Sequence, residues 1–177
     1  MNPKEIKIKM TSDIIQVSAD QLWRIVGPGF GDVGTWTSSV DRSTGTGIPQ
    51  FSGAPCSDRV CHVNISGYDK ICEKITYYDH NKQQMAYEIT DGVPGFVLLA
   101  RNHWTIREVG KNQSVAEMNC TMRLSPLMGM LLGGVMKRKV TKNLEEVFQE
   151  LKAYAEKGEL SSKKRKRMLE LNRAEAL

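Results

Sequence analysis

The feature that most constrains the fold is a long amphipathic segment, Pro126 to Lys157, which follows a region punctuated by proline and glycine. Pro126 suits a helix start and Gly158 suits its C-terminal cap. At 1.5 Å per residue the helix would be roughly 45 Å long. Its apolar residues recur at three- and four-residue steps, which predicts one continuous apolar face: Met128, Leu131, Leu132, Val135, Met136, Val140, Leu144, Val147, Phe148 and Leu151.

The first part of the chain predicts a strand and two short helices. Glu5 to Val17 begins with apolar and polar residues in alternation, which is typical of a strand. Ser18 and Gln21 have the spacing of a capping box, so a helix is expected over Ala19 to Val26. Glycine and proline end this helix, and Phe30 to Gly34 has room for only a short helical turn.

Six more strands are expected, mostly joined by short turns. They are Trp36 to Thr46, Asp58 to Ser66, Asp69 to Tyr78, Gln84 to Thr90, Val97 to Val109 and Gln113 to Leu124. Short connections favour an antiparallel meander over parallel strands with crossover helices. The order predicts an α+β fold in which a curved antiparallel sheet wraps around the long C-terminal helix. A cavity is expected between them.

Composition and charge narrow the class of protein. The 177 residues, 40% of them hydrophobic, fit one globular domain. The net charge is +5, but residues 159–177 carry six basic and three acidic side chains, so the body is near neutral. A near-neutral body argues against nucleic-acid binding. No apolar run approaches the roughly 20 residues that span a bilayer, and Met1 to Met10 lacks the core of a signal peptide. We therefore expect a cytoplasmic protein.

The chain is divided at Gly158 into a ligand-binding domain, residues 1–158, and a basic extension, residues 159–177. Five basic residues follow Ser161 and Ser162. A solvated helical end is the favoured interpretation of this run, while nuclear import, nucleic acid and an anionic membrane are alternatives. Its apolar residues have approximate helical spacing, which would also suit packing, a partner or self-association: Leu160, Met168, Leu171 and Ala174.

Residues that bind metals or act as nucleophiles form no recognisable motif. The cysteines, Cys56, Cys61, Cys72 and Cys120, include no C-x-x-C pair and are expected to be reduced. The three histidines are scattered, and no nucleophile elbow or phosphate-binding glycine loop occurs. We therefore expect neither a metal nor a cofactor.

Several segments, taken in order, resemble the START/Bet v 1-like (SRPBCC) superfamily, in particular its polyketide cyclase/dehydrase and lipid-transport branch. They are Phe30-Gly-Asp-Val-Gly-Thr-Trp36, Asp58-Arg59-Val60, Cys72-Glu-Lys-Ile-Thr-Tyr-Tyr-Asp79, Met85-Ala-Tyr-Glu-Ile89 and Leu124-Ser125-Pro126. The resemblance covers about Ile6 to Glu156. It implies a helix-grip fold with an internal pocket for a hydrophobic small molecule. It does not fix an activity, because the superfamily includes lipid carriers, hormone receptors and aromatase/cyclases.

Strand alternation and the helix predict which side chains face this pocket. The candidate ligand-binding residues are Trp36, Arg59, Glu73, Tyr87, Asn102, Trp104, Met118, Met122, Leu132 and Met136. Tyr77 and Leu98 also fall on inward registers. Burying Arg59 or Glu73 alone would cost several kcal/mol, so each needs a partner, water or a ligand. A structural ion pair is favoured over an anchor for a ligand head group or an acid/base.

The predicted function is noncovalent binding, and transport, of a hydrophobic small molecule such as a lipid or polyketide. The first alternative is a cyclase or aromatase-like enzyme with Glu73 as acid/base, assisted by Tyr87 or Arg59. The second is a regulatory interaction module that acts through the basic tail. A non-enzymatic role is favoured, because no nucleophile or metal set is visible in the sequence.

Overall fold

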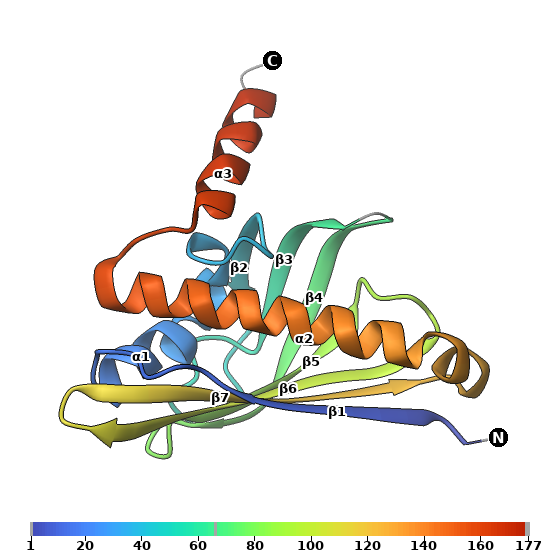
Figure 1. Cartoon of the computed structure of the whole chain (residues 1–177), viewed down its shortest axis with the longest axis horizontal. Helices are drawn as coiled ribbons and strands as arrows, with labels where there is room; N and C mark the ends of the chain where they lie inside the picture. Colours follow the sequence, from blue (N-terminus) through green and yellow to red (C-terminus); the bar gives the residue numbers. More distant parts are fainter. Residues whose placement is uncertain (1, 66, 176–177) are drawn as a thin grey trace.

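The computed structural model describes residues 2–65 and 67–175, and in this part of the chain seven strands form one antiparallel sheet (Figure 1). The order across the sheet is β1-β7-β6-β5-β4-β3-β2. The strands are β1 (Lys4–Thr11), β2 (Arg42–Thr46), β3 (Asp58–Ile65), β4 (Tyr68–Asp79), β5 (Gln84–Asp91), β6 (Val97–Gly110) and β7 (Gln113–Leu124). The predicted end of the third strand, Ser66, lies outside the described residues.

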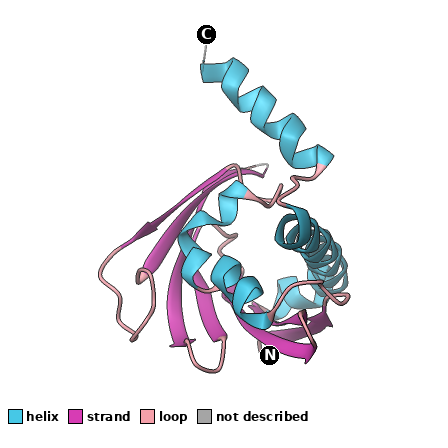
Figure 2. Cartoon of the chain, turned by 90° about the vertical axis from the view of Figure 1, so that its left-hand side faces the viewer, coloured by secondary structure: helices cyan, strands magenta, loops and turns pink. Residues whose placement is uncertain are grey.

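The helices have the predicted order. Helix α1 (Ala19–Val26) and the 3-10 helix η1 (Pro28–Thr35) follow β1, and α2 (Pro126–Lys157) follows β7. A further helix, α3 (Ser162–Glu175), ends the described chain and projects from the body (Figure 1). Figure 2 shows the sheet curving around α2, which is seen nearly end-on. The α+β helix-grip architecture is thus confirmed. None of the described helices is both long and apolar enough to cross a membrane.

The predicted helix ends are also present. Ser18 accepts a hydrogen bond from the Gln21 backbone, and the Gln21 side chain accepts one from the Ser18 backbone N–H, which completes the capping box of α1. Helix α2 begins at Pro126 and ends before Gly158, whose φ of 68° places it in the left-handed region that glycine tolerates. These local signals set where α1 begins and where α2 begins and ends.

The predicted apolar face of α2 is only half right. Its C-terminal half buries Leu144, Val147, Phe148 and Leu151, whereas Leu131 is 64% exposed and Val135 also faces solvent. The positions that approach the sheet in the first turns are Gly129 and Gly133, which pack along the Lys4 side chain of β1. A Cβ on Gly129 would lie 2.6 Å from Lys4 Cβ. The close approach requires glycine there, so the leucines point outward.

β-Bulges account for two further errors in the predicted registers. Leu98 is 52% exposed, because the pairing of β6 with β7 shifts between Val97 and Leu99. Tyr78 is buried in place of Tyr77, since the pairing of β4 with β5 shifts between Ile75 and Tyr77. One extra residue in a strand exchanges the faces of every side chain beyond it.

Two strands are shorter than predicted. The first ends at Thr11, after which only Ile15 forms an isolated bridge to Ser114. The second begins at Arg42 instead of Trp36. The backbone of Trp36 and Thr37 continues the turn of η1 by donating to the Val33 carbonyl.

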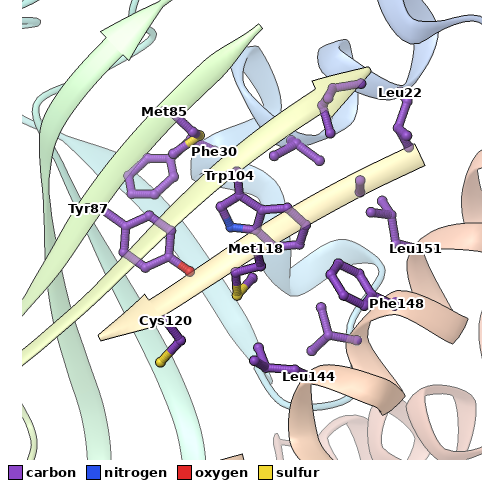
Figure 3. Close-up of a cluster of buried hydrophobic side chains, with 14 of the residues drawn as sticks. Leu22, Phe30, Met85, Tyr87, Trp104, Met118, Cys120, Leu144, Phe148 and Leu151 are labelled. Carbon is purple, nitrogen blue, oxygen red and sulfur yellow. The ribbon is translucent and has the colours of Figure 1, made fainter. Parts of the chain in front are cut away.

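The core lies between the inner face of the sheet and the C-terminal half of α2 (Figure 3). The Trp104 and Phe148 rings pack edge to face, with centroids 5.7 Å apart. Leu151 is fully buried beside them, and Met118 lies beneath Trp104 in the same cluster. These contacts attach α2 to β6 and β7.

We predict that Leu151→Ala lowers the free energy of unfolding by about 2–5 kcal/mol, because it leaves a cavity under α2. Leu131→Ala, on the exposed face of the same helix, should change it by less than about 0.5 kcal/mol. Urea denaturation followed by circular dichroism measures both. Equal losses would mean that the face of α2 has been assigned wrongly.

Candidate functional site

A pocket of about 670 Å³ lies between the inner face of the sheet and α2. Its lining includes eight of the predicted site residues: Trp36, Arg59, Glu73, Tyr87, Asn102, Trp104, Met118 and Met136. The other two are elsewhere. Met122 is 4% exposed and belongs to the core, and Leu132 is half-buried on α2 away from this lining. A role in ligand binding stays a prediction for all ten.

Arg59 and Glu73 form an ion pair inside the pocket. They are partners in the register of β3 with β4, and both side chains are over nine-tenths buried. Arg59 Nε donates to Glu73 Oε2 at 2.6 Å, and Nη2 lies 2.5 Å from the same oxygen. Nη1 donates to the Phe30 carbonyl of η1 at 2.6 Å. The predicted pairing is therefore present, and it links two strands to η1.

Aromatic rings cover the guanidinium. Its Cζ lies 3.9 Å from the centroid of the Phe30 ring and 5.1 Å from that of Tyr87. Such positions stabilise a desolvated cation. Burial alone would lower the pKa of the Arg59 guanidinium, yet the adjacent Glu73 carboxylate, with Tyr87 and Cys61, raises it above its ordinary value. Arg59 is thus charged at every working pH.

Neighbouring titratable groups in the pocket are neutral. Burial raises the pKa of Tyr87 to about 12 and that of Cys61 to about 12. The Cys61 thiol donates to Glu73 Oε2 at 3.4 Å. At neutral pH the inner pocket therefore presents a phenol, a thiol and a charge-neutral ion pair among apolar side chains.

The mouth of the pocket is built from residues that strand periodicity missed. The loop 36–41 after η1 forms one side, and Lys139 and Asn143 of α2 form another. Lys163, Lys166, Arg167 and Glu170 of α3 complete it. The basic run of α3 is visible in the sequence, but the sequence pattern does not predict that this run lies beside loop 36–41.

A buried carboxylate, Glu150 of α2, holds the mouth loop in place. Its Oε2 accepts from Thr37 Oγ1 at 2.9 Å and from the Ser38 backbone N–H at 2.8 Å. Its Oε1 accepts from Ser161 Oγ at 2.5 Å, just before α3. These bonds explain why residues 36–41 leave the strand conformation that their sequence pattern favours.

Helix α3 is fastened to the same loop by two cations. Lys164 is 1% exposed and donates to the Val40 and Asp41 carbonyls at 2.7 and 3.2 Å. Arg167 donates to both carboxylate oxygens of Asp41, each at 2.7 Å. A bidentate arginine–carboxylate pair fixes geometry as well as distance. At least part of the basic run is therefore packed against the body, although the division of the chain at Gly158 stays a prediction.

Within residues 2–65 and 67–175, no three His, Cys, Asp or Glu side chains gather closely enough to hold a metal ion. The cysteines are all free thiols, and three of them, Cys56, Cys61 and Cys120, are buried.

We predict that Glu73→Leu lowers the free energy of unfolding by about 3–5 kcal/mol, because it leaves Arg59 buried without its counter-charge. The double variant Arg59→Met/Glu73→Leu should lose about 2 kcal/mol less than the sum of the two single changes. Urea unfolding of the three variants measures this coupling. Additivity within about 0.5 kcal/mol would contradict a stabilising pair.

Solved structures share this fold at low sequence identity. A norcoclaurine synthase point mutant from Thalictrum flavum, in complex with a transition state analogue, has a TM-score of 0.67 at 10% identity, covering 88% of this chain and 96% of that one. The Zhui aromatase/cyclase from Streptomyces sp. R1128 has a TM-score of 0.63 at 12% identity, covering 89% and 100%. A START superfamily protein from Mycobacterium smegmatis has a TM-score of 0.57 at 16% identity, covering 82% and 98%.

At these identities the structural likeness shows the fold alone, and no curated protein matches the sequence significantly. The family assignment comes from the sequence itself. The profile described as "Polyketide cyclase / dehydrase and lipid transport" matches residues 6–156, from β1 almost to the end of α2. The chain therefore belongs to the polyketide cyclase / dehydrase and lipid transport family.

Proposed function

We propose that the chain binds a hydrophobic small molecule, lipid-like or polyketide-like, in the pocket between the sheet and α2. The observation that carries this proposal is the pocket itself. Its volume of about 670 Å³ falls within the range of roughly 300–1,000 Å³ that small-molecule sites occupy. Aliphatic, aromatic and methionine side chains dominate the inner lining, among them Val63, Ile71, Met85, Trp104 and Met118.

The polar groups in the pocket support binding better than acid–base chemistry. Glu73, the acid/base of the cyclase alternative, uses Oε2 to accept from Arg59 and from Cys61. Arg59 is in turn bonded to the Phe30 backbone. A carboxylate held in this way is part of the wall of the pocket. Membership of a family whose name covers both cyclases and lipid transport agrees with either role.

The proposal is tested by filling the pocket from α2. Val140 lines the pocket, whereas Val135, five residues earlier, is 51% exposed. We predict that Val140→Trp weakens the binding of Nile red, a neutral apolar dye, at least about tenfold, because the indole takes the dye's place. Val135→Trp is the matched control and should leave binding unchanged. Fluorescence titration gives the affinities, and thermal unfolding verifies that both variants are folded.

Native mass spectrometry of the purified chain complements this titration. A co-purified apolar molecule that is present in the wild type and depleted in Val140→Trp would identify the natural chemical class. If the dye binds both tryptophan variants as tightly as the wild type, the pocket is not the binding site and the proposal fails.

A further inference from the structure

Two hydrogen-bond donors at the mouth of the pocket have no partner within the described chain. Trp36 Nε1 and Ser38 Oγ are both buried, and both residues line the pocket. Trp36 is only 4% exposed, and its indole N–H can donate but not accept. The other two such atoms among the described residues, Tyr78 Oη and His103 Nε2, belong to side chains outside this lining. Unmet donors are thus a feature of the mouth, and they require an acceptor.

The charges around the mouth point to an acceptor that is anionic. Both mouth carboxylates are engaged: Arg167 pairs with Asp41 at 2.7 Å and with Glu170 at 3.3 Å. Lys163 is paired as well, with Glu146 at 2.6 Å. Lys139 and Lys166, by contrast, form no ion pair within the described part of the chain. The mouth therefore carries uncompensated positive charge.

The frame that carries these groups is held rigidly. Glu150 accepts from Thr37, the Ser38 backbone and Ser161, and it does not bond the Trp36 and Ser38 side-chain donors. Lys164 and Arg167 fasten α3 to residues 40 and 41 of the same loop. A site whose supports are already bonded loses little conformational freedom when it binds.

We propose that the mouth is a subsite for the anionic head group of an amphipathic ligand. Trp36 and Ser38 donate hydrogen bonds to its oxygens, and Lys139 and Lys166 supply the counter-charge. The apolar part of the ligand lies deeper, against the sheet, where the Arg59–Glu73 pair is neutral. This inference rests on the proposed function and narrows it, because it names the polarity of the ligand and its direction in the pocket. A carboxylate and a phosphate monoester share the required chemistry.

The test compares ligands of one chain length and different head groups: dodecanoate, dodecyl phosphate, dodecanol and dodecyltrimethylammonium. Each is titrated against bound Nile red, dodecanol below its solubility limit and the three charged ligands below their micelle concentrations. We expect the better anion to bind about tenfold or more tightly than the alcohol at low salt, and the cation to bind weakest. The advantage should shrink at high salt, because these cations are near the surface. Whichever of the two anions binds more tightly identifies the chemistry of the head group.

Paired variants locate the effect. Lys139→Gln/Lys166→Gln should abolish the preference for the anion and leave the affinity for dodecanol unchanged. Lys137→Gln/Lys142→Gln removes the same charge from the outward groove of α2 and should preserve the preference. Trp36→Phe keeps an aromatic ring but removes the N–H donor. It should weaken binding of the anion about tenfold and have little effect on binding of dodecanol.

The two proposals fail differently. If dodecanol binds as tightly as both anions, or if the two lysine pairs behave alike, the anionic subsite is wrong while the pocket stands. If the ammonium amphiphile binds most tightly, the positive charge assigned to the mouth is wrong. If none of the four ligands displaces the dye, the proposed function fails, and this inference fails with it.

Discussion

The interaction on which the rest of the pocket depends is the buried ion pair between Arg59 and Glu73. It joins β3 to β4 across their ladder, and through the Phe30 carbonyl it fixes η1 over the sheet. The same guanidinium lies under the rings of Phe30 and Tyr87. Charges buried this deeply are tolerated only when they are paired and hydrogen-bonded. The ion pair is therefore one of the contacts that hold η1 over the inner face of the sheet.

The pocket has two chemically distinct ends. At the inner end, charge is cancelled within the ion pair, and the remaining lining is apolar or neutral. At the mouth, two lysines and two unmatched donors remain after every nearby carboxylate has been engaged. An apolar interior with a few convergent polar groups is the usual composition of a small-molecule site. Here the unpaired polar groups lie at the mouth of the pocket.

Much of this arrangement was predictable from local sequence patterns. The capping box at Ser18, the start of α2 at Pro126 and its end at Gly158 are confirmed because each depends on a few neighbouring residues. Strand alternation also placed Arg59 and Glu73 inward, and the structure pairs them across β3 and β4. The errors arose where distant residues decide. Bulges in β4 and β6 reversed the faces at Tyr77 and Leu98, and alternation contains no sign of a bulge.

The mouth could not be predicted for the same reason. Trp36 to Val40 has the alternation of a strand, but Glu150, more than a hundred residues later, holds it as a loop. The five basic residues after Ser162 have the composition of a solvated tail, yet Lys164 is almost completely buried. Both outcomes depend on hydrogen bonds between segments that are remote in sequence.

Helix α3 contributes one side of the mouth of the pocket. The family profile matches residues 6–156, so the side of the mouth formed by Lys163, Lys166 and Arg167 lies outside the matched residues. Loss of this helix would leave the Arg59–Glu73 pair and the Trp104–Phe148 contact in place, but would remove the bonds that hold residues 40 and 41. Under the role proposed for the mouth, changes confined to α3 would alter the choice of ligand and leave the contacts between the sheet and α2 in place.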